Sequence, residues 1–303
     1  MPFSLHPSAT IHDILLQATT FLKNSGVEDS GLAVEWIICH ELACARLELA
    51  LRHNDRLSPE ASRSVQEHVN RMAAGEPLQY VLGEAEFMGR LFHVDRRGLI
   101  PRPETELLAE LVLDRADLWA LPRPNIAEVG TGSGCIIISL ASAQPHGSYQ
   151  ANDIAPDILD LARKNAARHG VQNCIRFYMD NLLSAVPPDS LDVVISNPPY
   201  VQTDAWAQLP AMIREHEPRA ALDGGPDGLS VIRPLITQTV QVLKPGGRLF
   251  LEIGADQGAA IQHLLTKNGF ADGEIRTDLA GKDRLVTARR PDLSNAGCAI
   301  NPY

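Results

Sequence analysis

The tetrapeptide Asn197-Pro198-Pro199-Tyr200 directly follows an apolar stretch rich in β-branched residues, 191–196. That stretch predicts a strand buried on both faces of a parallel sheet. Two successive prolines have no N–H groups and hold φ near about −65°, and a residue before proline is kept out of helical geometry. We therefore expect a rigid turn that presents one carboxamide, one free carbonyl and one aromatic ring at the carboxyl end of the sheet, where open α/β sheets bind ligands.

This set of groups suits the chemistry of a planar NH2 group on a conjugated system. Such a nitrogen is a poor nucleophile because its lone pair is delocalised. The side-chain oxygen of Asn197 and the carbonyl of Pro198 could accept both N–H hydrogens and direct the lone pair at an electrophile. Tyr200 could pack on the flat face of the substrate group and near a cation. Asn and Pro are also common turn residues, so the tetrapeptide alone leaves open a turn without chemistry.

A glycine-rich turn marks a second candidate site. Gly130-Thr131-Gly132-Ser133-Gly134 lies between a predicted strand, 125–129, and a predicted helix, 135–143. Glycines let the backbone approach a ligand closely at the start of a helix. The third glycine comes one position earlier than in the dinucleotide fingerprint Gly-x-Gly-x-x-Gly, which disfavours NAD and a nicotinamide oxidoreductase.

Acids end the next two predicted strands. Asp153 ends strand 148–154, 19 positions after Gly134, and could accept both ribose hydroxyl hydrogens of a nucleoside. A helix cap ahead of a following proline is the alternative interpretation of this residue. Asp180 ends strand 174–180 and, with Asn181, could hydrogen-bond an adenine amino group, or it could only terminate the strand.

The elements that must position these residues fall into three parts. Residues 1–76 predict a small bundle of amphipathic helices, with helices near 11–22, 30–51 and 59–72. Residues 77–124 predict a hairpin within 85–100 and a connecting helix from Pro103 to Val112. Glu104 and Thr105 either form the first turn of that helix, where acids favour the helix dipole, or border a cofactor pocket.

Residues 125–290 predict strands that alternate with helices. Helices are expected at 156–169, 229–243 and 256–268, further strands at 248–253, 274–278 and 284–288, and a long loop at 201–228 that forms a substrate-side wall. This alternation predicts an α/β fold, a doubly wound and mostly parallel seven-stranded sheet. The short link between the last two strands predicts an antiparallel ending. The tail, 291–303, is expected to be disordered.

Composition limits the classes of function. A length of 303 residues favours about two domains. A net charge of −10 disfavours general binding to polyanions. The five cysteines include no Cys-x-x-Cys pair, which favours free thiols in a reducing cytoplasm over disulfides or a metal site. No signal peptide is evident, and no apolar stretch approaches the ~18 residues needed to span a bilayer, so we expect a cytoplasmic protein without a membrane partner.

The motifs taken together resemble a known family. The stretch 128–134, Asp153 and Asn197-Pro198-Pro199-Tyr200, in this order, are similar to those of class I S-adenosylmethionine-dependent methyltransferases. The added stretches 75–80, 99–106 and 217–219 narrow the resemblance to the HemK-type family, the peptide chain release factor glutamine methyltransferases. The resemblance extends from about residue 10 to residue 290.

The resemblance implies that S-adenosylmethionine is the cofactor. It also implies that the substrate is the glutamine of the Gly-Gly-Gln motif in class-one peptide chain release factors. The residues that it implies for the cofactor are Gly130, Thr131, Gly132, Ser133 and Gly134 at the methionine part, Asp153 at the ribose, Asp180 and Asn181 at the adenine, and Glu104, Thr105 and Asn197 at the pocket border. Those implied for the glutamine amide are Asn197, Pro198, Pro199 and Tyr200.

Two residues depart from the family pattern. Glu128 stands where an aspartate is frequent, and Asn181 stands where an aromatic residue can stack on adenine. The second departure leaves the adenine contact open. The apolar periodicity of the helical bundle indicates mutual packing and does not itself reveal a second role; we expect the bundle, 1–76, to dock the substrate. We also expect a monomer without direct nucleic-acid contact.

The expected reaction is an in-line displacement at a sulfonium methyl carbon. Orientation of the amide could contribute about 7 to 11 kcal/mol, and no general base is nominated, because an N-methylated amide cation loses its proton readily. A DNA adenine-amino methyltransferase could use the same turn on a flipped base. The motifs also leave open a methyltransferase that acts on a glutamine of a ribosomal protein, and an inactive nucleotide-binding protein that serves as an assembly partner.

Overall fold

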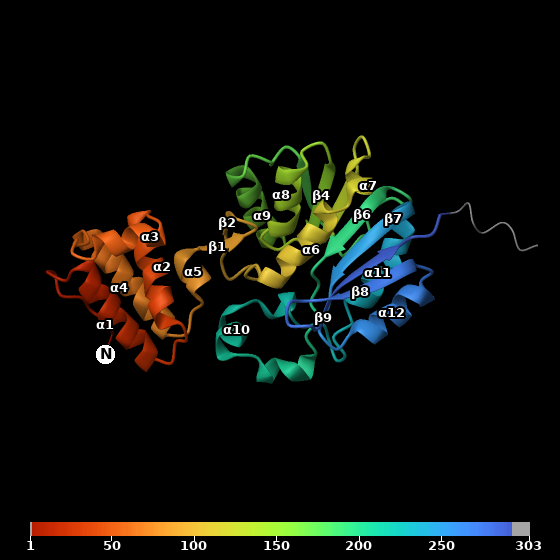
Figure 1. Cartoon of the computed structure of the whole chain (residues 1–303). Coiled ribbons are helices and arrows are strands. Elements are labelled where there is room, and N and C mark those ends of the chain that lie inside the picture. The colour runs from red at the N-terminus through yellow and green to blue at the C-terminus, as the bar shows by residue number, and fades with distance from the viewer. Residues whose placement is uncertain (1, 293–303) are drawn as a thin grey trace, which may run out of the picture. The chain divides into compact units, whose positions relative to one another are not determined.

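The structure is a computed structural model that describes residues 2–292 (Figure 1). Within these residues the chain forms two compact units. The first contains the residues up to Glu84 together with Pro210–His216, and the second contains Ala85–Leu209 together with the residues from Glu217 onward. No helix in the described part of the chain is long and apolar enough to cross a membrane.

The first unit is helical and is built around one apolar core. Its helices are α1 (Ile11–Asn24), α2 (Ser30–Leu42), α3 (Arg46–Leu49), η1 (Ala50–Arg52), α4 (Pro59–Ala73), α5 (Leu78–Leu82) and α10 (Ala211–His216). Thr10 forms a capping box with Asp13 at the start of α1, and Ser58 caps α4 ahead of Pro59. The buried residues of α1, α2 and α4 pack together in the core, which includes Ile11, Ile14, Leu22, Val34, Ile37, Val65 and Val69.

The prediction of one continuous helix over 30–51 was wrong. Ala43 has a left-handed backbone, with φ of 47°, and its N–H bonds the carbonyls of Cys39 and His40. This arrangement ends a helix without a glycine. The chain then re-enters helical geometry at Arg46, so the single expected helix is divided into α2, α3 and η1.

The second unit contains a seven-stranded sheet with the order β5-β4-β3-β6-β7-β9-β8. The strands are β3 (Asn125–Val129), β4 (Ser148–Asp153), β5 (Ile175–Met179), β6 (Leu191–Ser196), β7 (Leu243–Glu252), β8 (Ala271–Thr277) and β9 (Asp283–Arg289). The pairs among β5, β4, β3, β6 and β7 are parallel, whereas β9 is antiparallel to both of its neighbours. The predicted fold class is therefore confirmed.

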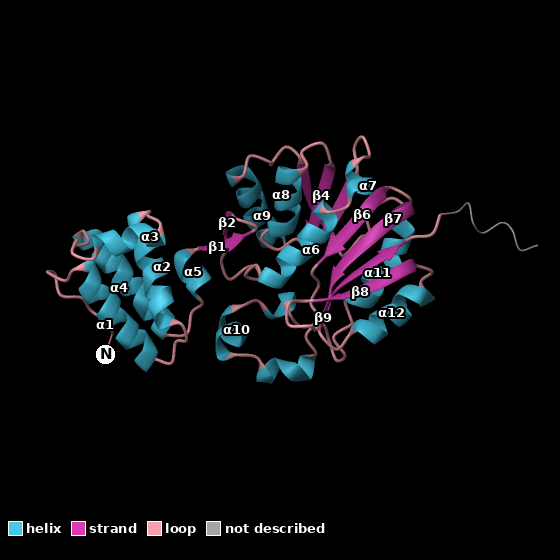
Figure 2. Cartoon of the chain, viewed as in Figure 1, coloured by secondary structure: helices cyan, strands magenta, loops and turns pink. Residues whose placement is uncertain are grey.

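Helices cover both faces of this sheet (Figure 2). One apolar layer joins the sheet to α6 (Pro103–Leu113), α8 (Cys135–Ala143) and α9 (Pro156–Arg168), and the other joins it to α11 (Ile232–Val242) and α12 (Gly258–Lys267). Successive residues of a strand belong to opposite layers, as Val193 and Val194 show. The unit also contains the short helix α7 (Ala116–Trp119), and a hairpin of β1 (Glu84–Phe87) and β2 (Arg90–His93) precedes α6.

Two further predictions of elements need correction, and a third falls outside the described residues. The helix predicted over 229–243 begins at Ile232, and residues 244–247 lie within β7 rather than in a turn after the helix, because β7 already pairs with β6 at Leu243. The loop 201–228 contains short helices, η2 (Thr203–Gln208), α10 and η3 (Arg219–Ala221). The predicted disordered tail lies, from residue 293 onward, outside the described residues.

Candidate active site

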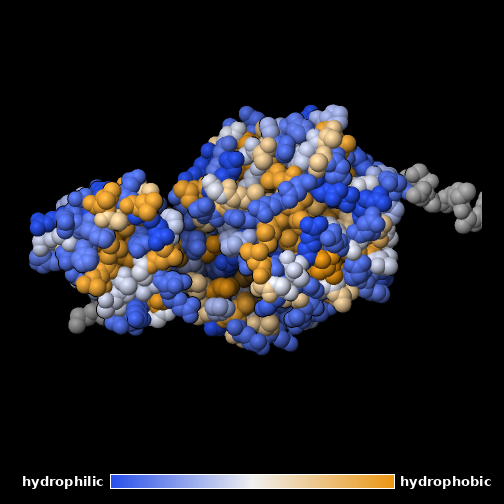
Figure 3. Space-filling model, in the orientation of Figure 1, coloured by the Kyte–Doolittle hydropathy of each residue, from blue (hydrophilic) through white to orange (hydrophobic). Residues whose placement is uncertain are grey.

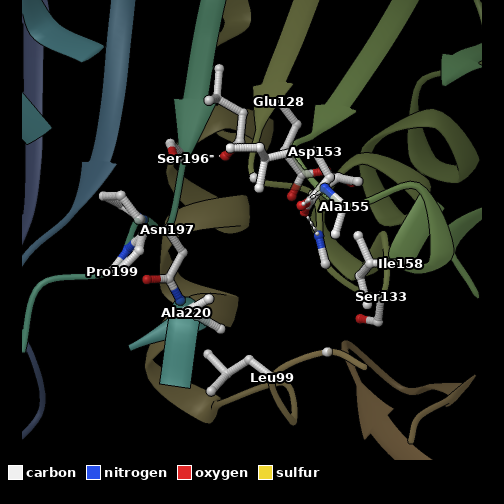
Figure 4. A pocket seen from close by; sticks show the side chains of 18 of the residues that line it. Leu99, Glu128, Ser133, Asp153, Ala155, Ile158, Ser196, Asn197, Pro199 and Ala220 are labelled. Atoms are coloured by element: carbon white, nitrogen blue, oxygen red, sulfur yellow. Dashed lines mark hydrogen bonds between the residues drawn. The ribbon is translucent and has the colours of Figure 1, made fainter. Parts of the chain in front are cut away.

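A cavity of about 390 Å³ opens in the second unit at the carboxyl ends of β3, β4 and β6 (Figure 4). Its lining comes from the turn after β3, the end of β4, the residues after β5 and the turn after β6, together with the segment 97–102 before α6 and residues of the 201–228 loop near η3. Figure 4 shows Asn197 and Asp153 on opposite sides of the cavity, with Leu99 across from the strand ends. The cavity therefore lies where the strand-end rule for open α/β sheets expects a ligand.

The glycine turn forms one wall of the cavity. Gly130 and Gly132 have φ of 69° and 54°, a left-handed conformation that side chains disfavour. A Cβ atom at either position would meet no atom within 4 Å, so the backbone here faces open space. Two hydrogen bonds, from Thr131 N to the Asn152 carbonyl at 2.9 Å and from Gly132 N to Asp153 Oδ2 at 3.1 Å, fasten the turn to the end of β4.

Asp153 is not the N-cap of the following helix, because Ala155 occupies that position. Its carboxylate accepts the backbone N–H of Gly132 on one oxygen and that of Ala155, at 3.2 Å, on the other. Burial raises the pKa of Asp153, and these backbone hydrogen bonds oppose the rise. The carboxylate is thus held at the cavity wall by two neighbouring segments.

Glu128 lies beneath the same turn and also lines the cavity. It is 1% exposed, and its carboxyl accepts the Thr131 hydroxyl at 2.6 Å and the Ile137 N–H at 3.3 Å. Burial raises the pKa of Glu128 to about 8 in spite of these donors. The sequence pointed to this position only as a departure from the family pattern.

The turn after β6 presents two acceptors. Asn197, Pro198 and Pro199 line the cavity. The Asn197 Nδ2 group donates to Thr105 Oγ1 at 3.0 Å, and its oxygen, Oδ1, accepts no hydrogen bond from residues 2–292 and is not buried. The Pro198 carbonyl likewise accepts none within the described residues. Both acceptors are therefore unpaired within residues 2–292.

Gln257, which does not line the cavity, holds this turn in place and is called the Gln257 clamp below. Gln257 donates from Nε2 to the carbonyls of Tyr200, at 3.0 Å, and Gly228, at 3.1 Å, and its side-chain oxygen accepts the Gly254 N–H. Gly228 has φ of 73°, and a Cβ there would lie 2.4 Å from the Tyr200 carbonyl oxygen. The turn is consequently restrained by neighbouring backbone as well as by its prolines.

Tyr200 does not line the cavity. Its hydroxyl donates to Glu252 Oε1 at 3.2 Å and accepts from Arg284 Nη1 at 3.4 Å. Burial raises the pKa of this phenol. The structure thus joins the Tyr200 hydroxyl to the end of β7, and its contact with a substrate stays a prediction.

Most of the other predicted site residues come together at the cavity. Thr105, Asp180 and Asn181 line it, whereas Glu104 and Gly134 do not. The Asp180 carboxylate accepts the Ser184 hydroxyl and the N–H groups of Asn181 and Ala185. These bonds fold the segment after β5 into a turn at the cavity edge.

Two buried acids were not recognised from the sequence as site residues. Glu217 forms an ion pair with Arg102 and accepts the Ile100 N–H, and so fastens the segment before α6 to the loop after β6. Glu252 ends β7 and accepts the hydroxyls of Thr105 and Tyr200. An acid at the end of a predicted strand, the signal that singled out Asp153, was also present at Glu252.

Comparisons with known proteins agree with this geometry. The family model of the PrmC N-terminal domain matches residues 13–83, and that of the methyltransferase small domain matches residues 104–225. A release factor glutamine methyltransferase of Moorella thermoacetica is 39% identical over 282 residues, which are 93% of this chain and 99% of that protein. This chain belongs to the release factor glutamine methyltransferase family. A second member, from Geobacter sulfurreducens, is 36% identical over 92% of this chain and 96% of its own length.

Membership of this family makes the chain an S-adenosylmethionine-dependent methyltransferase. Solved structures support the fold alone. The crystal structure of the hMettl16 catalytic domain, in complex with a MAT2A 3'UTR hairpin, has a TM-score of 0.53 and 16% identity. The match covers 72% of this chain and 79% of that one.

Proposed function

We propose that this enzyme transfers a methyl group to the side-chain amide nitrogen of the glutamine in the Gly-Gly-Gln motif of class-one peptide chain release factors. The observation that carries the proposal is the pair of free acceptors, Asn197 Oδ1 and the Pro198 carbonyl, at the cavity beside the glycine turn. A primary amide has two N–H donors and can satisfy both acceptors at once, whereas a hydroxyl has only one. The name of the family relatives, release factor glutamine methyltransferase, narrows the choice of amide.

The cavity fits S-adenosylmethionine as the methyl donor. The open backbone of Gly130 and Gly132 leaves room for a close approach at the start of α8. Asp153 would accept the ribose hydroxyls, and Asp180 with Asn181 would lie by the adenine. Thr131 and Ser133 would lie at the methionine part, and Thr105 would border the site, whereas Gly134 and Glu104 would act only by shaping the turn and the start of α6. When bound, the cofactor supplies an electrophilic methyl carbon on a sulfonium.

The residues of the β6 turn orient the nucleophile. With both N–H bonds held in one plane by Asn197 and Pro198, the nitrogen lone pair points out of that plane. Because the prolines and the Gln257 clamp restrain the turn before substrate arrives, little ordering remains to be done on binding. Pro199 and Tyr200 would pack beside the amide. No residue is assigned as a base, because a methylated amide cation releases its proton to water.

We assign docking of the release factor to the first unit, which the PrmC N-terminal domain model matches. Apolar side chains are exposed on and after α2 and α3, with Leu47 at 87%, Leu51 at 88% and Trp36 at 41% exposure. Figure 3 shows apolar surface over this part of the unit. Exposed apolar groups of this kind are frequent at protein interfaces.

The test is methyl transfer to a purified release factor, read by peptide mass at the Gly-Gly-Gln glutamine. We expect one methyl group on wild-type release factor and none on a release factor with that glutamine replaced by alanine. A ribosomal-protein mixture and duplex DNA serve as competing substrates. Transfer to either of these and not to the release factor would refute the proposal.

A further inference from the structure

We propose that Thr105, with its hydroxyl hydrogen held by Glu252, is a positioning residue that determines which way round the Asn197 carboxamide sits. The oxygen of Asn197 then faces the substrate amide, and its nitrogen faces away. This inference rests on the proposed function, because it assigns these residues a task in holding the glutamine.

The contacts join three segments that are distant in sequence. Thr105 Oγ1, at the start of α6, donates to Glu252 Oε2 at 2.7 Å, and Asn197 Nδ2 donates to the same Thr105 oxygen at 3.0 Å. Thr105 is 3% exposed and Glu252 is 1% exposed. Because these two groups are buried, water does not readily replace either partner.

The direction of the bonds follows from the number of hydrogens. Burial raises the pKa of Glu252, and the hydroxyl of Thr105, the charge of Arg284 and the hydroxyl of Tyr200 oppose the rise by favouring the carboxylate. We take Glu252 as this carboxylate, which accepts and does not donate, and a threonine hydroxyl has a single hydrogen. Since that hydrogen goes to Glu252, the Thr105 oxygen can offer Asn197 only lone pairs. It therefore binds the NH2 side of the carboxamide, and a reversed Asn197 would place two acceptors against each other.

The second oxygen of Glu252 is also used as an acceptor. Arg284 has only donors and contacts the Tyr200 hydroxyl at 3.4 Å, so the hydrogen of that hydroxyl is directed to Glu252 Oε1. Both carboxylate oxygens thus receive hydroxyl hydrogens. Neither is available to reverse the bond to Thr105.

The consequence for the site is a fixed pair of acceptors. With Nδ2 committed to Thr105, Oδ1 is the group that Asn197 presents beside the Pro198 carbonyl. A carboxamide turned the other way would place its NH2 group against the NH2 group of the substrate. Thr105 and Glu252 act through Asn197 and touch no reacting atom in this assignment.

The experiment compares Thr105→Val, which is nearly isosteric and lacks the hydroxyl, with Thr105→Ser, which keeps it. We expect Thr105→Val to lower kcat for release factor methylation by about tenfold or more, the effect of losing one oriented hydrogen bond. Thr105→Ser should stay within about threefold of wild type, and the cofactor Kd of both variants within about twofold, because the bond orients the substrate rather than the cofactor.

A double-mutant cycle separates this role from a structural one. If Thr105 acts through Asn197, Thr105→Val should cost no further activity in an Asn197→Ala background, measured over long incubations by peptide mass. The same fold-loss in both backgrounds would overturn the proposal. So would a loss of kcat in Thr105→Ser equal to that in Thr105→Val.

A spectroscopic readout on the free protein needs no substrate. In protein labelled with ¹⁵N-asparagine, the Asn197 side-chain amide is identified by its loss in Asn197→Ala. We expect its two N–H signals to be shifted or broadened in Thr105→Val and kept in Thr105→Ser. Glu252→Asp, which keeps the charge but withdraws the carboxylate, should disturb the same signals.

Unchanged Asn197 signals in Thr105→Val would overturn the role of Thr105, and unchanged signals in Glu252→Asp would overturn that of Glu252. These outcomes are independent of the proposed function, which fails separately if wild-type enzyme transfers no methyl group to the release factor.

Discussion

Replacing Glu128 with glutamine should make the stability of this enzyme less dependent on pH. Glu128 is fully buried at the end of β3, and burial raises its pKa to about 8 against the hydrogen bonds from Thr131 and Ile137. Its carboxyl is therefore mostly neutral in the folded protein at pH 7 and ionised in the unfolded chain. Glutamine has nearly the shape of the neutral acid and does not titrate.

The size of the effect follows from proton linkage. Between the unfolded pKa of 4.5 and the folded pKa of about 8, the folded state holds a proton that the unfolded chain has released. The contribution of Glu128 to the free energy of unfolding is thus present below pH 4.5 and is lost as the pH rises toward 8. Each unit corresponds to about 1.4 kcal/mol, so the loss is at most about 5 kcal/mol.

Urea unfolding of wild type and Glu128→Gln at a series of pH values provides the measurement. Other groups with raised pKa values that do not interact with Glu128, such as Glu252, contribute equally to both proteins and cancel in the difference. A Trp36→Phe background leaves Trp119 and Trp206, both in the second unit, as the only tryptophans, so fluorescence follows the unit that contains Glu128.

The variant should gain about 1.4 kcal/mol on wild type for each pH unit between roughly pH 5 and 8, and the difference should then level off. A difference that stays flat over this range would refute the reasoning. It would mean that Glu128 is ionised in the folded protein and that its two hydrogen bonds outweigh the cost of burial.

Three further substitutions test other parts of the site. Asn197→Ala should lower kcat by more than it raises the cofactor Kd, and equal losses would count against its role in orienting the amide. Asp153→Ala should raise the cofactor Kd by about tenfold or more in calorimetric titration, since hydrogen bonds to charged groups contribute about 1.5–3 kcal/mol, and an unchanged Kd would exclude a ribose contact. Gly228→Ala should lower both the Tm and kcat, because its Cβ would meet the Tyr200 carbonyl oxygen. The control is Gly170→Ala, which has a similar φ of 71° and no atom within 4 Å of the new Cβ and should lower only the Tm.

The centre of the sheet could be predicted from sequence because β3 and β6 are short, mostly apolar runs that end at a glycine and at Asn197-Pro198. The strand at 191–196 and the helix at 135–143 have the predicted bounds. The break at Ala43 was not predictable in this way, because alanine favours helices and no glycine or proline marks the position. The start of β7 was missed for the opposite reason, since Lys244-Pro245-Gly246-Gly247 has the composition of a turn.

The candidate site also contains residues that local sequence patterns reveal and residues that they do not. The glycine turn, Asp153 and Asn197 were recognisable because the carboxyl ends of neighbouring parallel strands meet at one edge of a sheet. The bond between Thr105 and Glu252 spans 147 positions, and Thr105 by itself is typical of the first turn of a helix. The burial of the Tyr200 hydroxyl depends on Glu252 and Arg284, which no local pattern connects to it.

The charges of the cavity lining favour a cationic ligand over a polyanion. The charged lining residues are the acids Glu128, Asp153 and Asp180 and the arginines Arg97 and Arg102. Each arginine forms an ion pair with an acid outside the lining, so its charge is already compensated. The acids Asp153 and Asp180 would attract a sulfonium and repel phosphates. Binding of a nucleic acid depends on lysine and arginine that neutralise its phosphates, and the two lining arginines are already paired with acids. This distribution of charge disfavours DNA as the substrate and is consistent with the release factor that we propose.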